Sequence, residues 1–366
     1  MNRRDFLKAS SLLALVPTVP GFLARTARAA EPKKAQRVLV VVQLDGGNDA
    51  LNTIVPHGDP NYAKLRPRLK IDPKNAVKLT DAVGLHPQLR SLDKLLQAGH
   101  LAAIPGVGYP NPNRSHFRSM AIWNTARFDP EEHTGYGWIG RALDADAGQS
   151  LLIGTDAMPV ALRGRRSSAV ALSRLDDLSL ADPVTVKQAA NNSTGDDDLL
   201  GFVQRQAVDA FAASDKLAGL VKHGDDASYP GTGLGERLKL VSRLLKANLG
   251  TRVFYCTQGG FDTHASQQFP HANLLSEFGG AVAAFFADLQ AAKLADRVTL
   301  LAFSEFGRTI KENASGGTDH GTAGAVFVAG PGVQGGLQGK VPSLTDLKDG
   351  EPLMTTDFRR VYATLL

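Results

Sequence analysis

The sequence has little cysteine and few aromatic residues. Cys256 is the single cysteine among 366 residues, so an internal disulfide cannot form and a disulfide-stabilised scaffold is excluded. Aromatic residues make up 7% of the chain, whereas 37 residues are glycine. With 43% hydrophobic and 21% charged residues, this composition is typical of an α/β protein with many tight loops, and it excludes a disordered chain.

The sequence also lacks a strong net charge once its N-terminus is set apart. The whole chain carries +5, and residues 1–29 hold five basic residues against Asp5, a net of +4. The rest of the chain therefore carries only about +1, and we expect no surface for nucleic acid.

Outside the N-terminus, no apolar run reaches the roughly 18 residues that a membrane-spanning helix needs. Residues 1–29 combine the pair Arg3-Arg4, an apolar stretch over residues 12–23 and a small-residue cleavage site at Ala27–Ala29. This pattern predicts a twin-arginine signal peptide and a periplasmic or secreted protein without a transmembrane anchor after cleavage. The alternatives are an ordinary secretory signal and an uncleaved anchor.

Strand-like and helix-like segments alternate after residue 36. The near-continuous apolar run 38–44 is typical of a strand covered on both faces, and the leucines between residues 85 and 96 follow a helical period. The alternation predicts one α/β domain over residues 36–366, with a doubly wound, mostly parallel sheet and helices on both faces. Residues 150–235 are rich in turn residues and predict a loop-rich insertion or cap. The chain ends without a helix stop, so we expect that a final element is missing.

Polar clusters stand at four expected strand ends. They are Asp45, then Asp262 with His264, then Glu305, and finally Asp319 with His320 before the last strand. One such carboxylate commonly only caps a helix, but the open edge of a parallel sheet would bring all four clusters together. Carboxylates and imidazoles are the usual ligands of zinc and manganese, so we expect these residues to bind a divalent ion such as Zn, Mn or Ca.

A possible nucleophile stands where a loop becomes a helix, in the segment "NPNRSHFR". Ser115 would lie at the positive end of that helix, which suits attack on a phosphate or sulfate. The alternative is that Ser115 or Asn113 only caps the helix. The guanidinium groups of Arg114 and Arg308 have the planar shape that binds an anionic group.

Several motifs together resemble an exported bacterial family known as domain of unknown function 1501. They are the twin-arginine start, "LDGGND", "FDTH", "SEFGRT" and "GTDHG". More remotely, the chain is similar to the alkaline phosphatase and sulfatase superfamily. That resemblance implies an alkaline phosphatase-like fold with two metal sites.

The superfamily resemblance also implies roles for particular residues. Asp45 matches its first aspartate, Ser115 its nucleophile, Asp262 with His264 its Asp/His pair, and His320 its last histidine. The chain departs from the pattern at Phe306, which stands where the superfamily offers an imidazole.

Two hypotheses for the function remain open. The first is an exported metal-dependent hydrolase of phosphate or sulfate esters, acting on an anionic small molecule or a polysaccharide ester. The second is a non-catalytic secreted binding or assembly protein that keeps the phosphatase-like fold. Phe306 favours the second hypothesis, whereas the presence of Ser115, Asp45, Asp262 and His320 favours the first.

The twin-arginine signal can be tested directly. Changing both Arg3 and Arg4 to lysine should block export, because the twin-arginine receptor reads the arginine pair. Cell fractionation with antibody detection would measure the result. Undiminished accumulation of the double variant in the periplasm would point to the ordinary secretory route.

Overall fold

The computed structural model of the protein describes residues 36–129, 135–145, 148–173 and 227–366. The predicted signal peptide at residues 1–29 and most of the predicted insertion, residues 174–226, lie outside the described residues. No helix in these described ranges is long and apolar enough to cross a membrane.

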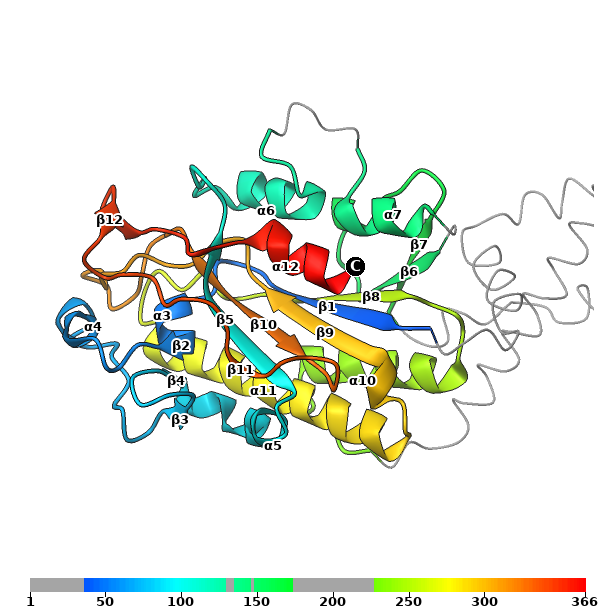
Figure 1. The fold of residues 1–366 in the computed structure, drawn as a ribbon, viewed down its shortest axis with the longest axis horizontal. Coiled ribbons are helices and arrows are strands. Elements are labelled where there is room, and N and C mark those ends of the chain that lie inside the picture. The colour runs from blue at the N-terminus through cyan, green and yellow to red at the C-terminus, as the bar shows by residue number, and fades with distance from the viewer. Residues whose placement is uncertain (1–35, 130–134, 146–147, 174–226) are drawn as a thin grey trace, which may run out of the picture.

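The centre of the fold is strand β1 (Val38–Leu44), as the apolar run predicts. It pairs in parallel with β8 (Val253–Gln258) on one side and with β9 (Val298–Phe303) on the other. All seven of its residues are buried, because helices cover both faces of the sheet (Figure 1). This is the environment in which an uninterrupted apolar strand is stable.

In the part of the chain that the structure describes, the main sheet has nine strands and is mostly parallel. Among these nine strands, β10 (Gly324–Ala329) alone runs antiparallel to its neighbours β9 and β5. The order is β11 (Gly336–Leu337), β5 (Leu101–Gly108), β10, β9, β1, β8, β6 (Gln149–Ile153) and β7 (Ser168–Leu172), and β14 (Thr356–Asp357) also pairs with β5.

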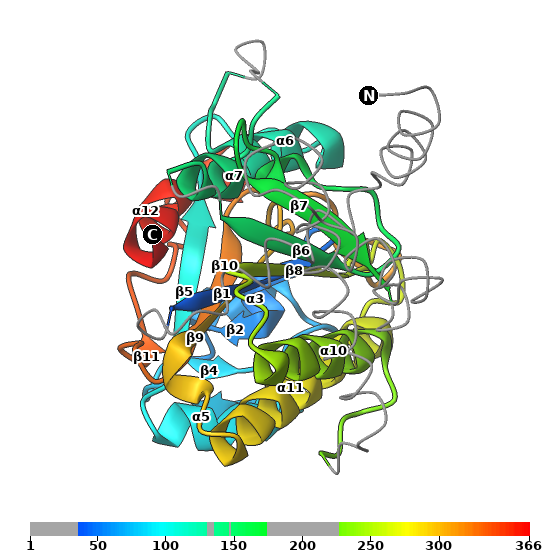
Figure 2. The same cartoon turned by 90° about the vertical axis from the view of Figure 1, so that its right-hand side faces the viewer.

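Helices pack on both faces of this sheet, and alternate residues of β1 point to the two layers. Val40 and Val42 belong to the core on one face, and Leu39 and Val41 to the core on the other. The first face carries α10 (Gly233–Ala247), α11 (Gln268–Ala291), η1 (Pro87–Leu92) and α5 (Asp93–Gln97), and the second carries α6 (His116–Thr125), α7 (Trp138–Leu143) and α12 (Phe358–Leu365) (Figures 1 and 2). The predicted doubly wound α/β fold is confirmed.

Short elements complete the described chain. They are α3 (Ala50–Thr53), β2 (Ile54–Val55), α4 (Pro60–Leu65), β3 (Val77–Lys78), β4 (Gly84–Leu85), η2 (Val160–Leu162), η4 (Ala295–Arg297), β12 (Leu347–Lys348) and β13 (Glu351–Pro352). Strands β2, β4 and β3 form a small separate sheet, and β12 pairs with β13.

The leucine stripe between residues 85 and 96 does not form one helix. Leu85 lies in β4, and a 3₁₀ segment with Pro87 at its start precedes the short helix α5. Leu89 and Leu92 are nevertheless buried, and η1 packs against α11. A spacing of three residues places side chains on one face in either kind of helix, so the pattern did not distinguish them.

The first part of the predicted insertion belongs to the main sheet. Strands β6 and β7 lie within or next to residues 150–173, and β6 pairs in parallel with β8. Helix α10 begins at Gly233 and packs on the same sheet. Residues 149–153 and 168–172, in the predicted insertion and at its border, are therefore part of the main sheet and do not form a separate cap.

A buried ion pair holds the loop that follows β1. Arg66 and Asp49 are both fully buried, with Nη1–Oδ2 and Nη2–Oδ1 distances of 2.7 and 3.1 Å. Burial raises the pKa of Asp49, but the charge and hydrogen bonds of Arg66 outweigh it and lower that pKa to about 2. Arg66 also donates to the carbonyls of Thr309 and Ile310, both at 2.7 Å, so it ties the loop after β1 to the loop after β9.

A second buried carboxylate, Glu351 of β13, has a different environment. Its Oε2 accepts a hydrogen bond of 3.3 Å from the backbone N–H of Ile310. Burial raises its pKa to about 7, against the lowering effect of Arg114 and Arg66, and the negative charge of Asp319 adds to the rise. The charged form of Glu351 is therefore unfavourable in the folded protein.

The buried ion pair predicts that Arg66→Ala and Arg68→Ala lower the free energy of unfolding by very different amounts. Arg66→Ala should lower the free energy of unfolding by about 3–5 kcal/mol, because it leaves the Asp49 carboxylate buried without its partner. Arg68 also bonds the loop after β9, through Glu312, but its side chain is 56% exposed. Arg68→Ala should therefore cost less than about 1 kcal/mol in the same urea titration. Equal losses would show that burial of the pair does not matter.

Glu351 predicts a pH-dependent stability. Its pKa is higher in the folded state than the ordinary value of 4.5, so the folded state binds the proton more tightly between those two values. The contribution of Glu351 to stability should therefore grow as the pH falls from about 8 to about 5, so over this range Glu351→Gln should lose about 1–3 kcal/mol of stability relative to wild type. Asp349→Asn, which changes an exposed carboxylate beside β13, is the matched control. A wild-type slope that Glu351→Gln leaves unaltered would contradict this assignment.

Candidate metal centre

The predicted site residues lie at one edge of the main sheet. Strands β1, β8 and β9 are parallel, so Asp45, Asp262 and Glu305, which follow them, lie at the same edge. Strand β10 is antiparallel, so the segment before it, which contains His320, reaches this edge as well. Strand β5 also ends there and leads into α6 (Figure 1).

Three of these side chains converge on one point. Oδ1 of Asp262 lies 3.0 Å from Nε2 of His264 and 3.1 Å from Nε2 of His320. The two Nε2 atoms lie 3.0 Å from each other. A carboxylate oxygen and two imidazole nitrogens therefore face one another at nearly equal distances.

The other nitrogen of each ring bonds an acceptor away from this point. Nδ1 of His264 lies 2.9 Å from Oδ1 of Asp319, and Nδ1 of His320 lies 2.8 Å from the backbone carbonyl of Arg114. An ionised carboxylate and a carbonyl can only accept, so each Nδ1 carries the proton and each Nε2 presents a lone pair. The hydrogen bond from His264 lowers the pKa of Asp319, which keeps that carboxylate ionised.

His116, in the first turn of α6, adds a third imidazole that was not among the predicted metal ligands. Its Nε2 lies 3.1 Å from Nε2 of His320 and 3.6 Å from Oδ2 of Asp262, and its Nδ1 lies 2.7 Å from Oε1 of Glu305. The three ligand atoms of His116, Asp262 and His320 all lie within 4.8 Å of one another. The sequence signal that could have found it is its position directly after Ser115, in the loop that enters α6.

These ligand atoms fit a bound cation. Lone pairs that face each other at about 3 Å repel unless a positive charge lies between them. Ligand atoms about 2.0–2.1 Å from one zinc ion lie roughly 3 Å or slightly more from each other. Imidazole, which dominates this cluster, is a ligand that zinc and similar transition metals prefer.

Arg308 occupies a different place from the one its predicted anion-binding role requires. Its side chain is fully buried, and Nη2 lies 2.5 Å from Oδ1 of Asp262. It also donates to backbone carbonyls, among them those of Gly47 at 2.7 Å and Thr318 at 3.0 Å, and its Nη1 lies 3.4 Å from Nε2 of His264. Burial raises the pKa of Asp262, but the hydrogen bond and the positive charge of Arg308 outweigh it and lower that pKa to about 2. In this geometry Arg308 positions Asp262.

The remaining predicted residues lie at the same edge but differ in their contacts. Ser115 is exposed at the N-cap of α6, and its hydroxyl forms no capping hydrogen bond. Arg114 has an exposed side chain and contributes its carbonyl to His320. Asp45 is exposed and accepts a hydrogen bond of 2.9 Å from Gln43, with no recorded contact to the histidines among the described residues. Glu305 joins the cluster through His116.

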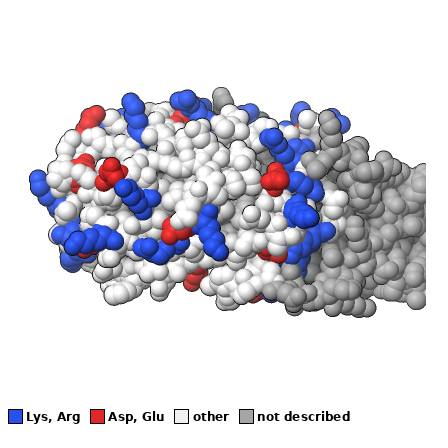
Figure 3. Space-filling view, turned by 60° about the horizontal axis from the view of Figure 1, so that its bottom comes forward, with Lys and Arg blue, Asp and Glu red and all other residues white. Residues whose placement is uncertain are grey.

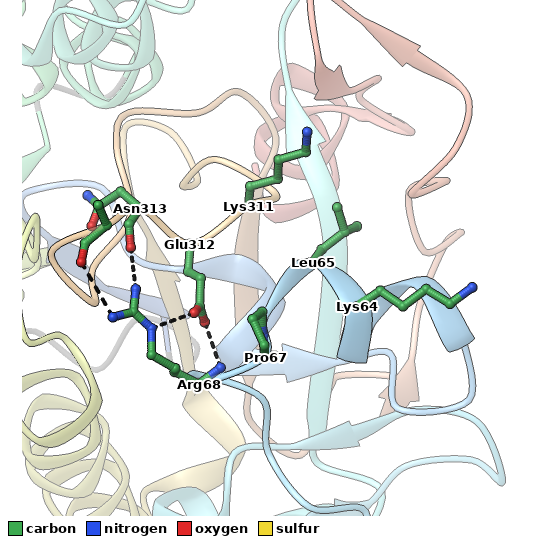
Figure 4. Close-up of a pocket in the computed structure, with 8 residues that line it drawn as sticks. Lys64, Leu65, Pro67, Arg68, Lys311, Glu312 and Asn313 are labelled. Carbon is green, nitrogen blue, oxygen red and sulfur yellow. Dashed lines mark hydrogen bonds and ion pairs between the residues drawn. The ribbon is translucent and has the colours of Figure 1, made fainter.

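A shallow pocket of about 350 Å³ adjoins this edge (Figure 4). Arg68 crosses its wall to Oε1 of Glu312 at 2.7 Å and to the carbonyl of Asn313, while Lys64 and Lys311 extend away from that pair. The Nδ2 group of Asn313 in turn donates a hydrogen bond of 2.9 Å to the backbone carbonyl of His264.

On the face of the molecule shown in Figure 3, basic and acidic side chains lie interspersed.

Several solved structures resemble this chain weakly. The C-terminal periplasmic domain of EptC from Escherichia coli, in complex with Zn, has a TM-score of 0.43 at 10% identity, with 81% of this chain and 73% of that chain covered. The lipoteichoic acid synthase LtaP from Listeria monocytogenes has a TM-score of 0.39 at 12% identity, with 88% and 75% covered. A protein in the alkaline phosphatase superfamily from Vibrio parahaemolyticus has a TM-score of 0.38 at 12% identity, with 87% and 69% covered. Likenesses of this strength carry no conclusion about activity.

Sequence comparisons are more specific. No curated protein gives a significant match. The family model described as "Protein of unknown function (DUF1501)" matches residues 104–365, which include the segments "FDTH", "SEFGRT" and "GTDHG" around the candidate metal centre. Since the match spans well over half of the sequence, the chain belongs to the DUF1501 family.

Proposed function

We propose that the protein is an exported, metal-dependent hydrolase of phosphate or sulfate esters. The observation that carries this proposal is the convergence of Asp262, His264 and His320 to within 3.0–3.1 Å, at the sheet edge where Ser115, whose hydroxyl forms no capping hydrogen bond, precedes helix α6. A metal ligand set and a nucleophile are the two parts that such a reaction requires.

Asp262, His264 and His320 would hold the metal in this proposal. Their mixed oxygen and nitrogen set suits zinc or manganese better than calcium, which prefers oxygen ligands. When bound, the ion would act as a Lewis acid that offsets negative charge on the substrate. Asp319 and the Arg114 carbonyl hold the rings of His264 and His320 in the orientation that exposes Nε2.

Ser115 would act as the nucleophile. Its Oγ would form a bond to phosphorus or sulfur while the bond to the leaving alcohol oxygen breaks, and the serine proton would pass to solvent. The alcohol would take up a proton from solvent, and water would then hydrolyse the ester on Ser115, which restores the hydroxyl. The exposed position of Ser115 at the start of α6 supports this role, because the free N–H groups of a first helical turn attract an anion.

Arg114 would help to bind the anionic group of the substrate. Its side chain is exposed next to Ser115 and is one residue away from the loop-to-helix junction. A guanidinium can bind two oxygens of a phosphate or sulfate at once. The substrate in this proposal is an anionic small molecule or a polysaccharide ester outside the cytoplasm, a location that agrees with the predicted twin-arginine signal.

Two substitutions distinguish the role of the proposed nucleophile from that of the proposed metal. Ser115→Ala should abolish turnover of a simple phosphate or sulfate ester and change stability by less than about 1 kcal/mol, roughly one helix cap. His320→Ala should remove the metal and, with it, the stability that binding adds to the folded state. Turnover on an ester panel, metal content and thermal unfolding would be measured for each. Ser343→Ala, at an exposed serine in a different loop, is the control.

The outcomes distinguish the two hypotheses for the function. Equal activity in wild type and Ser115→Ala would show that Ser115 is not the nucleophile. A metal-loaded wild type that turns over no ester in the panel would favour a secreted binding or assembly protein.

A further inference from the structure

Glu305 is bonded on all sides within the protein. It is 1% exposed, and its Oε1 accepts hydrogen bonds from the backbone N–H of Gly46 at 3.0 Å and from Nδ1 of His116 at 2.7 Å. Its Oε2 lies 3.0 Å from Oγ of Ser304. The carboxylate thus stands behind the ring of His116, on the side opposite to the imidazole cluster.

The side chain next to Glu305 supports the same ring. Phe306 is 1% exposed, and its ring centre lies 4.9 Å from that of His116 and 4.9 Å from that of His320. Residue 306 is where the superfamily resemblance leads us to expect an imidazole. In this chain a phenyl ring fills that place, and the imidazole of His116 reaches the cluster from α6 instead.

We propose that His116 is a further ligand of the metal centre, and that Glu305 is a positioning residue that acts through His116. This inference rests on the metal centre of the proposed function but not on the hydrolysis. It replaces the expectation that Glu305 itself is a ligand.

The orientation of His116 follows from its acceptor. Bonded to a carboxylate oxygen, Nδ1 carries the proton, so Nε2 has its lone pair toward Asp262 and His320. A side chain in the first turn of a helix, 31% exposed, would otherwise sample other rotamers. A second contact holds α6 against Glu305. Ser119 lies almost one turn further along α6, and its Oγ donates a hydrogen bond of 2.5 Å to the backbone carbonyl of Glu305.

The same contacts leave Glu305 and Asp45 poorly placed to form a second metal site. Oε1 of Glu305 accepts two hydrogen bonds and Oε2 lies 3.0 Å from the Ser304 hydroxyl, and Asp45 accepts a hydrogen bond from Gln43 of the preceding strand. The centre should therefore bind one transition-metal ion, with imidazole nitrogen in the majority of its ligands.

The experiment is a zinc titration of the full-length purified protein, with a chromophoric chelator as competitor. Wild type should bind one equivalent. His116→Ala and Glu305→Ala should each weaken zinc binding about 10- to 100-fold, the range for loss of a partner around a metal. In the His116→Ala background, Glu305→Ala should cause no further loss, because Glu305 acts through that ring. His100→Ala changes a partly exposed histidine at the opposite edge of the sheet and is the control.

A conservative variant covers the case in which Glu305→Ala does not fold. Glu305→Gln can keep an acceptor oxygen at the Oε1 position, toward Gly46 and His116, and an amide toward Ser304. Zinc affinity should then fall less than about tenfold, since the orientation of His116 survives. Cobalt-loaded wild type and Glu305→Gln should also share one visible spectrum, whereas His116→Ala should alter it.

Three results would overturn the proposal. The first is an affinity that His116→Ala leaves at the wild-type value. The second is an equal loss of zinc affinity on Glu305→Ala in the wild-type and the His116→Ala backgrounds, which would make Glu305 a direct ligand. The third is a second zinc equivalent that disappears in Asp45→Asn, which would reinstate a two-metal centre. None of these results depends on an active esterase, so they are separate from failure of the hydrolase proposal.

Discussion

The guanidinium group of Arg308 holds together the loops that form the candidate metal centre. Arg308 follows β9, is fully buried, and donates to the carbonyls of Gly46 after β1, Phe261 after β8 and Thr318 before β10. A buried charge requires a partner of opposite sign, and Asp262 supplies it at 2.5 Å. The carboxylate that faces the histidines is therefore fixed by the same group that fixes the surrounding backbone.

This arrangement requires a backbone that approaches closely. Gly46 and Gly47 have φ angles of +114° and +78°, in the region that glycine adopts without strain. A Cβ at Gly46 would lie 2.5 Å from the backbone nitrogen of Asp262, and a Cβ at Gly47 would lie 2.4 Å from the ring of Phe306. The two glycines of "LDGGND" thus allow Arg308 and Phe306 to pack against the loop after β1.

Around this scaffold, each histidine of the cluster has an outer acceptor and an inner lone pair. The outer acceptors come from three different segments: Asp319 before β10, the carbonyl of Arg114 before α6, and Glu305 after β9. A cation would relieve the repulsion among the inner nitrogens. The segments "SEFGRT" and "GTDHG" both supply residues to this cluster, Glu305 and Arg308 from the first and Asp319 and His320 from the second. Under the functional proposal, the loop before α6 would bring Ser115 to this centre.

The sequence by itself determined the strands, because an apolar run such as 38–44 is stable only inside a covered sheet, and it determined which strand ends carry carboxylates and imidazoles. It also located the start of α6, since Ser115 precedes a helical segment. It did not determine the break in the leucine stripe, because periods of 3.0 and 3.6 residues look alike over so few residues. Only the tertiary structure decided which side chains pair at the site. Arg308 contacts Asp262, at a sequence separation of 46 residues, and Glu305 contacts His116, at a separation of 189 residues. Such pairings depend on which loops meet at the sheet edge, and the antiparallel β10, which local sequence does not reveal, brings His320 to that edge.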